Sequence, residues 1–187
     1  MPREPAPATQ AAIDRILEAW IPVRQDLQDE GVVPADVDAY CILAASSAVT
    51  VFRERYGLKA TAVSCDLAVK SAEGEYELVV EHPEESSAIG VDDRYEQEVY
   101  FGHVVAVVED ETGTYLIDPE LRVVAPVGAS GHVFATTAEG VAVLLSMRTE
   151  RDEFAKTTAW DAGPAVAKRI AAAINNLDGG AGDQACS

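Results

Sequence analysis

The order of the predicted elements indicates an α+β fold, with helices first, an antiparallel sheet in the middle and one helix at the end. Apolar residues recur at helical spacing near both ends of the chain, the apolar period changes at Leu58, and turn residues separate the short apolar runs that follow. The 187 residues are enough for a single domain with a sizeable core. We therefore expect one α+β domain over residues 9–178, a flexible tail over 1–8 and a disordered tail over 179–187.

Two helices are predicted before the sheet. The first carries apolar residues at helical spacing, and Pro22 should kink it or divide it in two. The second begins after Asp36 or Asp38, either of which can serve as its N-cap, and it ends before Gly57. Its small and apolar residues are typical of a central, buried helix. This start places Cys41 near the positive end of the helix dipole.

The sheet is predicted from a series of short apolar runs. Residues Val99–Val108 are nearly all apolar or aromatic, as in a strand buried on both faces. A turn follows in which Gly113 is able to take a positive φ, and a second strand ends at Asp118-Pro119, since proline has no N–H for the ladder. The other expected elements are strands at 60–69, 75–80, 121–124, 133–135 and 141–147, an ambiguous segment at 154–160, a polar loop at 81–93 placed to overhang a site, and a final helix capped by Asp161.

Charge and hydropathy exclude several classes of function. The formal net charge is −18 and the sequence pI is near 4.3, so phosphates would repel this surface and nucleic-acid binding is not expected. The charge favours cationic partners such as a basic protein, although we expect most of it to serve solubility. No segment approaches the roughly 18 uninterrupted apolar residues of a membrane span. The N-terminus also lacks the apolar run of a secretory signal, so no membrane association is predicted and the cytoplasm is the expected compartment.

Metals and cofactors are not expected. The three cysteines and three histidines are too few and too scattered for a zinc site or a disulfide framework. No GxGxxG or P-loop motif indicates a nucleotide cofactor. Cys65 is interpreted as a packing residue inside a strand, His82 as a solvated loop residue, and His132 as a residue that no position marks as a ligand.

A catalytic triad is predicted from one helix and one hairpin. His103 is near the start of one strand of the hairpin and Asp118 ends the other, so the two should lie close, although the whole hairpin separates them in sequence. A histidine oriented by a carboxylate supplies two thirds of a triad. Cys41 is the candidate nucleophile, because a helix N-terminus and an imidazolium both stabilise a thiolate, and its backbone N–H is a candidate oxyanion donor. Tyr40 is expected either to line a substrate cleft or to pack between the two N-terminal helices.

A family resemblance is carried by three stretches: YCILAASSAVTVFRERYGLKA, a strand that begins GHVVAVV, and a second strand that closes in YLIDP. They resemble the transglutaminase-like superfamily, which groups transglutaminases, bacterial transglutaminase-like cysteine peptidases and arylamine N-acetyltransferases. The resemblance covers roughly Asp38 to Pro119. It implies a papain-like core in which Cys41 is the nucleophile, His103 the base and Asp118 the residue that orients the base.

The resemblance implies a thiol-dependent amide-bond hydrolase, either a cysteine peptidase or amidase or an enzyme of transglutaminase-like acyl transfer, acting on a peptide or amide through a thioester. The alternative is a catalytically inactive transglutaminase-like domain that serves as an acidic protein-binding module. A third possibility is a coincidental triad on an unrelated acidic α+β domain. The sequence does not distinguish hydrolysis from acyl transfer and indicates no oligomeric state.

Overall fold

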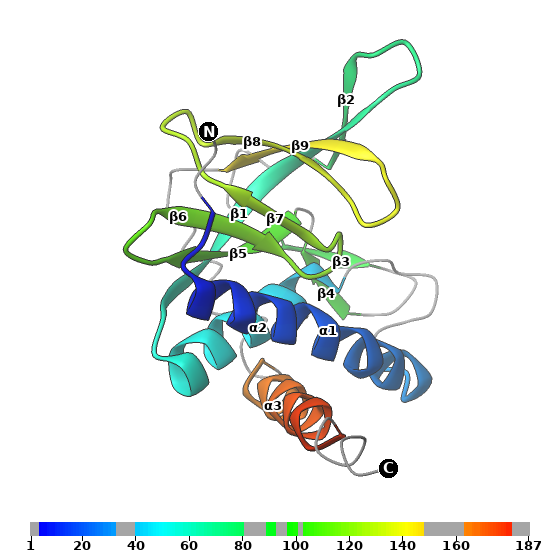
Figure 1. The fold of residues 1–187 in the computed structure, drawn as a ribbon. Coiled ribbons are helices and arrows are strands. Elements are labelled where there is room, and N and C mark those ends of the chain that lie inside the picture. The colour runs from blue at the N-terminus through cyan, green and yellow to red at the C-terminus, as the bar shows by residue number, and fades with distance from the viewer. Residues whose placement is uncertain are drawn as a thin grey trace.

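The computed structural model describes residues 4–32, 40–80, 89–92, 97–100, 103–147 and 163–180. Within these ranges, three helices and an antiparallel sheet form an α+β fold, as predicted (Figure 1). The helices are α1 (Pro7–Asp29), α2 (Cys41–Tyr56) and α3 (Gly163–Gly180). The strands are β1 (Lys59–Lys70), β2 (Tyr76–Val80), β3 (Ile89–Asp92), β4 (Gln97–Tyr100), β5 (His103–Glu109), β6 (Thr114–Asp118), β7 (Val123–Pro126), β8 (His132–Thr136) and β9 (Ala142–Met147).

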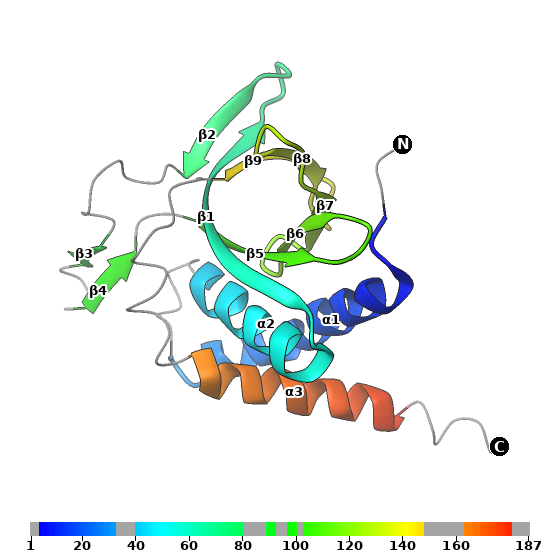
Figure 2. The same cartoon turned by 90° about the vertical axis from the view of Figure 1, so that its left-hand side faces the viewer.

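The main sheet curls until it is nearly closed. Its strands run in the order β7-β6-β5-β1-β9-β8, and β7 and β8 at the two ends lie against each other (Figure 2). The long strand β1 makes this possible, because its first half pairs with β5 and its second half pairs with β9 and β2. Apolar side chains from several strands, including Val105, Leu116 and Leu145, fill the inside of the curl. β3 and β4 pair separately as a two-stranded sheet.

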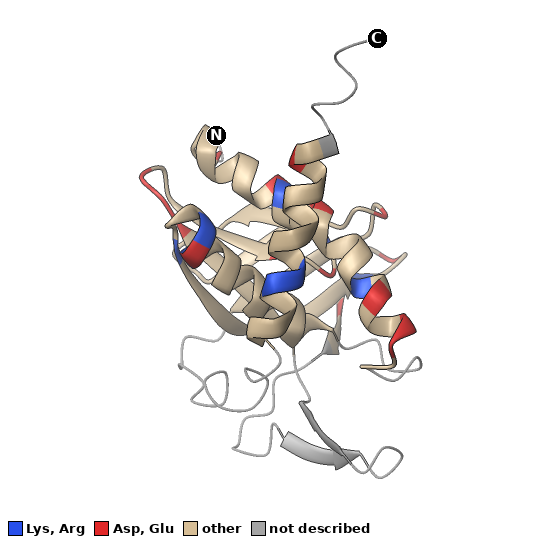
Figure 3. Ribbon diagram, turned by 90° about the horizontal axis from the view of Figure 1, so that it is seen from below, with Lys and Arg blue, Asp and Glu red and all other residues tan. Residues whose placement is uncertain are grey.

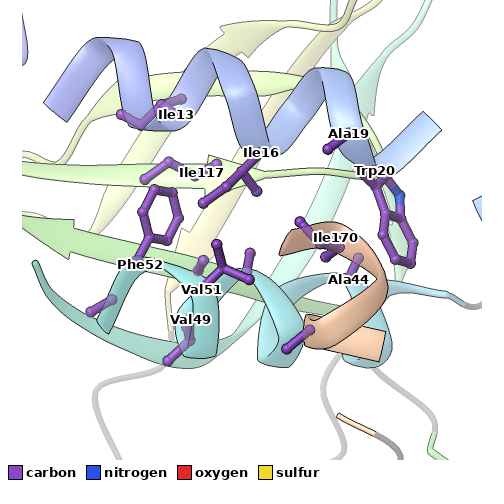
Figure 4. Close-up of a cluster of buried hydrophobic side chains, with 14 of the residues drawn as sticks. Ile13, Ile16, Ala19, Trp20, Ala44, Val49, Val51, Phe52, Ile117 and Ile170 are labelled. Atoms are coloured by element: carbon purple, nitrogen blue, oxygen red, sulfur yellow. The ribbon is translucent and has the colours of Figure 1, made fainter. Parts of the chain in front are cut away.

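The helices cover the outer face of the sheet at β5 and β1. α2 lies next to the sheet, and α1 and α3 pack against α2 (Figure 2). The buried residues of α2 include several small ones, and Ala44, Ala45 and Ala48 are fully buried. Small side chains let the helix approach the strands closely on one side and α3 on the other. Larger residues from α1, α2, α3 and β6 complete this core (Figure 4).

Residues 4–8 differ from the predicted flexible tail. The backbone N–H of Ala6 donates to Asp110 Oδ2 over 2.9 Å, and the Tyr115 hydroxyl donates to the carbonyl oxygen of Glu4 over 2.8 Å. α1 therefore begins at Pro7, directly after a segment that is fixed to the turn between β5 and β6. The expectation was wrong for these residues because the turn that holds them lies about a hundred residues further along the chain.

The β5–β6 turn is held by a side chain instead of by glycine flexibility. Gly113 does not take a positive φ. Asp110 Oδ1 accepts hydrogen bonds from the backbone N–H groups of Thr112, over 2.7 Å, and of Gly113, over 3.1 Å. An aspartate that bonds to the backbone two residues on gives the chain a local alternative to a left-handed glycine.

Several predicted boundaries are also corrected. Pro22 lies inside one continuous helix, where it does not divide α1. The run Val99–Val108 is not one strand, because its first two residues belong to β4 and His103 starts β5. Ile89–Asp92, expected in the polar loop 81–93, form β3. Gly179 and Gly180, expected in the disordered tail, end α3. The candidate segment 154–160, the cap Asp161 and residues 181–187 lie outside the described residues.

Most of the remaining predicted strands are confirmed, and the strand expected at 121–124 lies two residues further on, as β7. β1, β2, β8 and β9 match the runs predicted for them to within two residues at each end. None of the helices in the described part of the chain combines the length and the apolar character that a span of a lipid bilayer requires.

Replacing Gly57 by alanine should destabilise the fold by about 1 kcal/mol, because this residue caps α2 with a φ of 65°, which L side chains rarely adopt. A Cβ at this position would meet no described atom within 4 Å, so the cost comes from the backbone alone. Gly128→Ala is the matched control, since it meets equally open space without a left-handed φ. We expect the control to change the free energy of unfolding by less than about 0.5 kcal/mol. Urea denaturation followed by circular dichroism measures both, and equal effects would contradict this account of the cap.

Candidate active site

His103 and Asp118 meet at one end of the curled sheet, as the hairpin predicts. The His103 Nε2–H donates to Asp118 Oδ2 over 2.6 Å. The contact is removed from water, since His103 is 7% exposed and Asp118 is 0% exposed. The two strands position it: β5 begins at His103 and β6 ends at Asp118, in an antiparallel pair.

The other carboxylate oxygen of Asp118 is also held. Asp118 Oδ1 accepts hydrogen bonds from the backbone N–H groups of Glu120, over 3.0 Å, and Leu121, over 3.1 Å. This turn follows β6 directly, and Pro119 in its first position has no N–H to compete. With one oxygen fixed by the backbone, the carboxylate has a single orientation in which to meet His103.

Cys41 is the first residue of α2, and its side chain lies close enough to His103 to raise the pKa of the imidazole. The first intrahelical bond of α2 is the one that Ala44 donates to the carbonyl oxygen of Tyr40 over 2.8 Å, so the helix begins where the thiol lies. The N-cap is Tyr40, which corrects the expected cap at Asp36 or Asp38, both outside the described residues. The position of Cys41 in the first turn is as predicted, at the positive end of the helix dipole.

The charge state of His103 follows from its two partners. Burial lowers the pKa of His103, but hydrogen bonds to Asp118 and Cys41 and the negative charges of these groups outweigh it and raise the pKa from 6.5 to about 10. At neutral pH the imidazole is therefore a cation. Because Nε2 is bound to Asp118, Nδ1 is the ring nitrogen left for the thiol.

Cys65 lies directly across from His103 in the β1–β5 pair. Its fully buried side chain belongs to the apolar cluster inside the curl, so the interpretation as a packing residue is supported. Burial, with the charges of Asp118, Cys41 and Asp66, raises the pKa of the Cys65 thiol well above its ordinary value. A thiol that stays protonated at neutral pH is a poor nucleophile. The two neighbouring cysteines therefore differ in environment: one is at a helix end, and the other is in the apolar interior.

Tyr40 is 1% exposed and belongs to the core cluster between the helices and the sheet. The Arg24 guanidinium lies 4.8 Å from the centre of its ring. Of the two roles expected for Tyr40, its burial fits packing beside α1 and gives no support to a place on the wall of a substrate cleft.

The other candidate residues lie apart from this constellation. His132 is exposed on β8, with Nδ1 2.9 Å from the Ser146 hydroxyl on β9. His82 lies outside the described residues. Among the side chains that the structure describes, no three His, Cys, Asp or Glu residues gather as metal ligands do.

Sequence reasoning missed three residues that border the site. Glu120 Oε1 accepts a hydrogen bond from Trp20 Nε1 over 2.6 Å, and Glu120 Oε2 accepts one from Arg24 Nε over 3.2 Å. Trp20 and Arg24 stand one turn apart on α1. Their four-residue spacing is visible in the sequence, but no local pattern connects them to a glutamate about a hundred residues away.

Comparisons with known proteins find no match. A scan against protein-family models, a search of curated proteins and a search of solved structures each return nothing similar to the chain. The assignment of function therefore depends on the geometry of Cys41, His103 and Asp118.

The buried imidazolium should make the stability of the protein depend on pH. Because the pKa of His103 is raised on folding, its stabilising contribution is fully present below about pH 6.5 and is lost as the pH rises through about 10. We expect His103→Gln to lower the free energy of unfolding more at about pH 6 than at about pH 10.5, as measured by urea denaturation.

Asp118→Asn provides the control background for this measurement. Without the carboxylate, His103→Gln should lose most of its dependence on pH above about pH 6.5, because a main cause of the raised pKa is gone. A difference between wild type and His103→Gln that stays constant from about pH 6 to about pH 10.5 would contradict a buried imidazolium.

Proposed function

We propose that the protein is a cysteine-dependent hydrolase of amide bonds, with Cys41 as nucleophile, His103 as acid and base, and Asp118 as the residue that orients His103. One observation carries this proposal: the buried His103 ring is held between the Asp118 carboxylate, at 2.6 Å, and the Cys41 side chain at the start of a helix. A thiol, an imidazole and a carboxylate in this order form a catalytic triad. The resemblance to the papain-like core of the transglutaminase-like superfamily leads to the same three residues.

Acylation uses the proton held on His103. The Cys41 thiolate attacks the carbonyl carbon of the substrate and forms a C–S bond, and the carbonyl π electrons move to oxygen. The backbone N–H of Cys41, at the positive end of α2, is the donor that we assign to this oxyanion. His103 Nδ1–H then protonates the leaving nitrogen as the C–N bond breaks, which releases an amine and leaves a thioester on Cys41.

Deacylation needs His103 as a base. Acylation of Cys41 itself favours the neutral form of His103 that can act as this base. Once Cys41 is acylated, its negative charge no longer raises the pKa of His103, so only Asp118 of the two groups that raise this pKa keeps its charge. The neutral imidazole accepts a proton from water, which attacks the thioester and expels the Cys41 thiolate. The carboxylic acid leaves and the starting ion pair is restored. An amine in place of water would give acyl transfer by the same steps.

The substrate class is a peptide or another amide, and none of these steps uses a metal or a cofactor. The alternative, an inactive module that binds a basic protein through its acidic surface, has less support. Viewed from below, the helices carry acidic and basic residues interspersed (Figure 3). Several acids there are paired with arginine, as in Arg15–Asp178 at 3.1 Å and Arg169–Glu30 at 2.7 Å.

Alkylation by iodoacetamide, followed by mass spectrometry of the peptides, tests the proposal. At about pH 6.5 a free thiol is almost wholly protonated, so rapid alkylation there requires a stabilised thiolate. We expect Cys41 to react at least about tenfold faster than free cysteine at this pH, and His103→Gln to abolish the advantage. Cys65, buried and protonated, should remain unmodified in the folded protein and serves as the internal control.

A panel of peptide amides then tests catalysis. Denaturing mass spectrometry should detect a thioester on Cys41, and Cys41→Ser should remove both this adduct and turnover. A Cys41 that resists alkylation until about pH 8.5, with no adduct from any amide, would contradict the enzyme and favour the binding module.

A further inference from the structure

Four side chains from three parts of the chain meet beside the triad and form what we call the Arg24 cluster: Trp20 and Arg24 on α1, Tyr40 before α2, and Glu120 after β6. Within it, Trp20 Nε1 and Arg24 Nε each donate to one oxygen of the Glu120 carboxylate, over 2.6 Å and 3.2 Å. The Arg24 guanidinium also lies 4.8 Å from the centre of the Tyr40 ring. One planar cation thus makes the contacts with both Glu120 and Tyr40.

The cluster is connected to Asp118 through the backbone of Glu120. The N–H of Glu120 donates to Asp118 Oδ1 over 3.0 Å, while the side chain of the same residue is anchored to α1. The position of that N–H helps to set the orientation of the Asp118 carboxylate, and through it that of His103. A shift of the Glu120 backbone would therefore be transmitted to the imidazole.

The cluster is connected to Cys41 through Tyr40. Tyr40 is the N-cap of α2 and the immediate neighbour of the nucleophile, and its carbonyl oxygen accepts the first intrahelical bond, from Ala44, over 2.8 Å. Packing of Arg24 on the Tyr40 ring fixes the residue from which the helix starts. Arg24 therefore contacts both the segment that precedes Cys41 and the segment that follows Asp118.

The charges of the cluster explain why Arg24 is needed. The Glu120 side chain is only 12% exposed. Burial raises the pKa of Glu120, the contacts with Trp20 and Arg24 lower it, and the nearby Asp118 charge raises it again. Two carboxylates this close and this buried repel each other, and the guanidinium offsets the repulsion. Without it, Glu120 would leave its position or bind a proton.

We propose that Arg24 and Glu120 are positioning residues, which hold the nucleophile-bearing and carboxylate-bearing segments in register through their contacts with Tyr40, Trp20 and Asp118. This inference rests on the proposed function, because register matters only if Cys41 and His103 react together. Neither residue touches the reacting atoms. Their effect is on the distance and alignment between the thiol and the imidazole.

The test is the second-order rate constant for iodoacetamide alkylation of Cys41, measured across pH in the full-length chain. We expect Arg24→Met and Glu120→Gln each to lower this rate constant at about pH 6.5 by about tenfold or more, since small misplacements in a catalytic constellation have effects of this size. We also expect their rate–pH profiles to move toward that of free cysteine. Arg24→Lys, which keeps the charge without the planar guanidinium, should recover part of the loss.

Arg169→Met is the matched control. Arg169 on α3 pairs with Glu30 at the end of α1, so its loss also breaks an arginine–glutamate contact between two parts of the chain, although a more exposed one. The alkylation rate constant of this variant should equal that of wild type. Circular dichroism and urea denaturation establish how much of each variant is folded. If Arg24→Met does not fold, Glu120→Gln and Arg24→Lys decide the question, since both keep a polar side chain of similar length.

The outcomes separate this inference from the proposed function. A wild-type Cys41 that is unreactive at about pH 6.5 would contradict the proposed function itself. A reactive wild type, with folded Arg24→Met and Glu120→Gln variants that keep its rate and pH profile, would overturn the positioning role and leave the proposed function intact. Equal slowing by Arg169→Met would also overturn it, because the effect would then be a general loosening of the helices.

Discussion

The buried contact between His103 and Asp118 is the interaction on which the rest of the site depends. A cation in an apolar interior is costly unless a charged partner and hydrogen bonds accompany it. Here Asp118 supplies the charge, and the backbone N–H groups of Glu120 and Leu121 hold Asp118 in place. The β5–β6 hairpin delivers both side chains to one end of the sheet, and the turn after β6 fixes the carboxylate. A histidine held as a cation at neutral pH is then available to a thiolate.

The fold brings the thiol to this cation by close packing. α2 packs against β1 and β5, and small buried residues of the helix, such as Ala44, Ala45 and Ala48, allow close packing. Its first residue, Cys41, is thereby placed against the start of β5. α1 braces the arrangement from outside, since Arg24 reaches both Tyr40 and Glu120. Helix packing therefore determines the geometry of the site. Larger residues at these positions of α2 would move Cys41 away from His103.

The parts of this structure that follow from local rules are predictable from the sequence. His103 and Asp118 belong to one hairpin, and antiparallel geometry alone brings them together. The long-range features cannot be predicted in this way. Cys65 lies opposite His103 because β1 pairs with β5, and neither segment contains a local sequence pattern that indicates the pairing of these non-consecutive strands. Glu120 and Arg24 are similarly connected only through tertiary packing. The prediction of a flexible tail was wrong at residues 4–8 for the same reason, because the residue that holds this segment, Asp110, is distant in sequence.

The ring ¹⁵N chemical shifts of His103 at about pH 8 test the central claim most directly, because they report the protonation of each nitrogen separately. The protein contains three histidines, and the signals lost in His103→Gln assign the residue. With a pKa of about 10, both ring nitrogens should carry protons at this pH. A spectrum with one protonated and one unprotonated nitrogen would show a neutral imidazole and contradict the account.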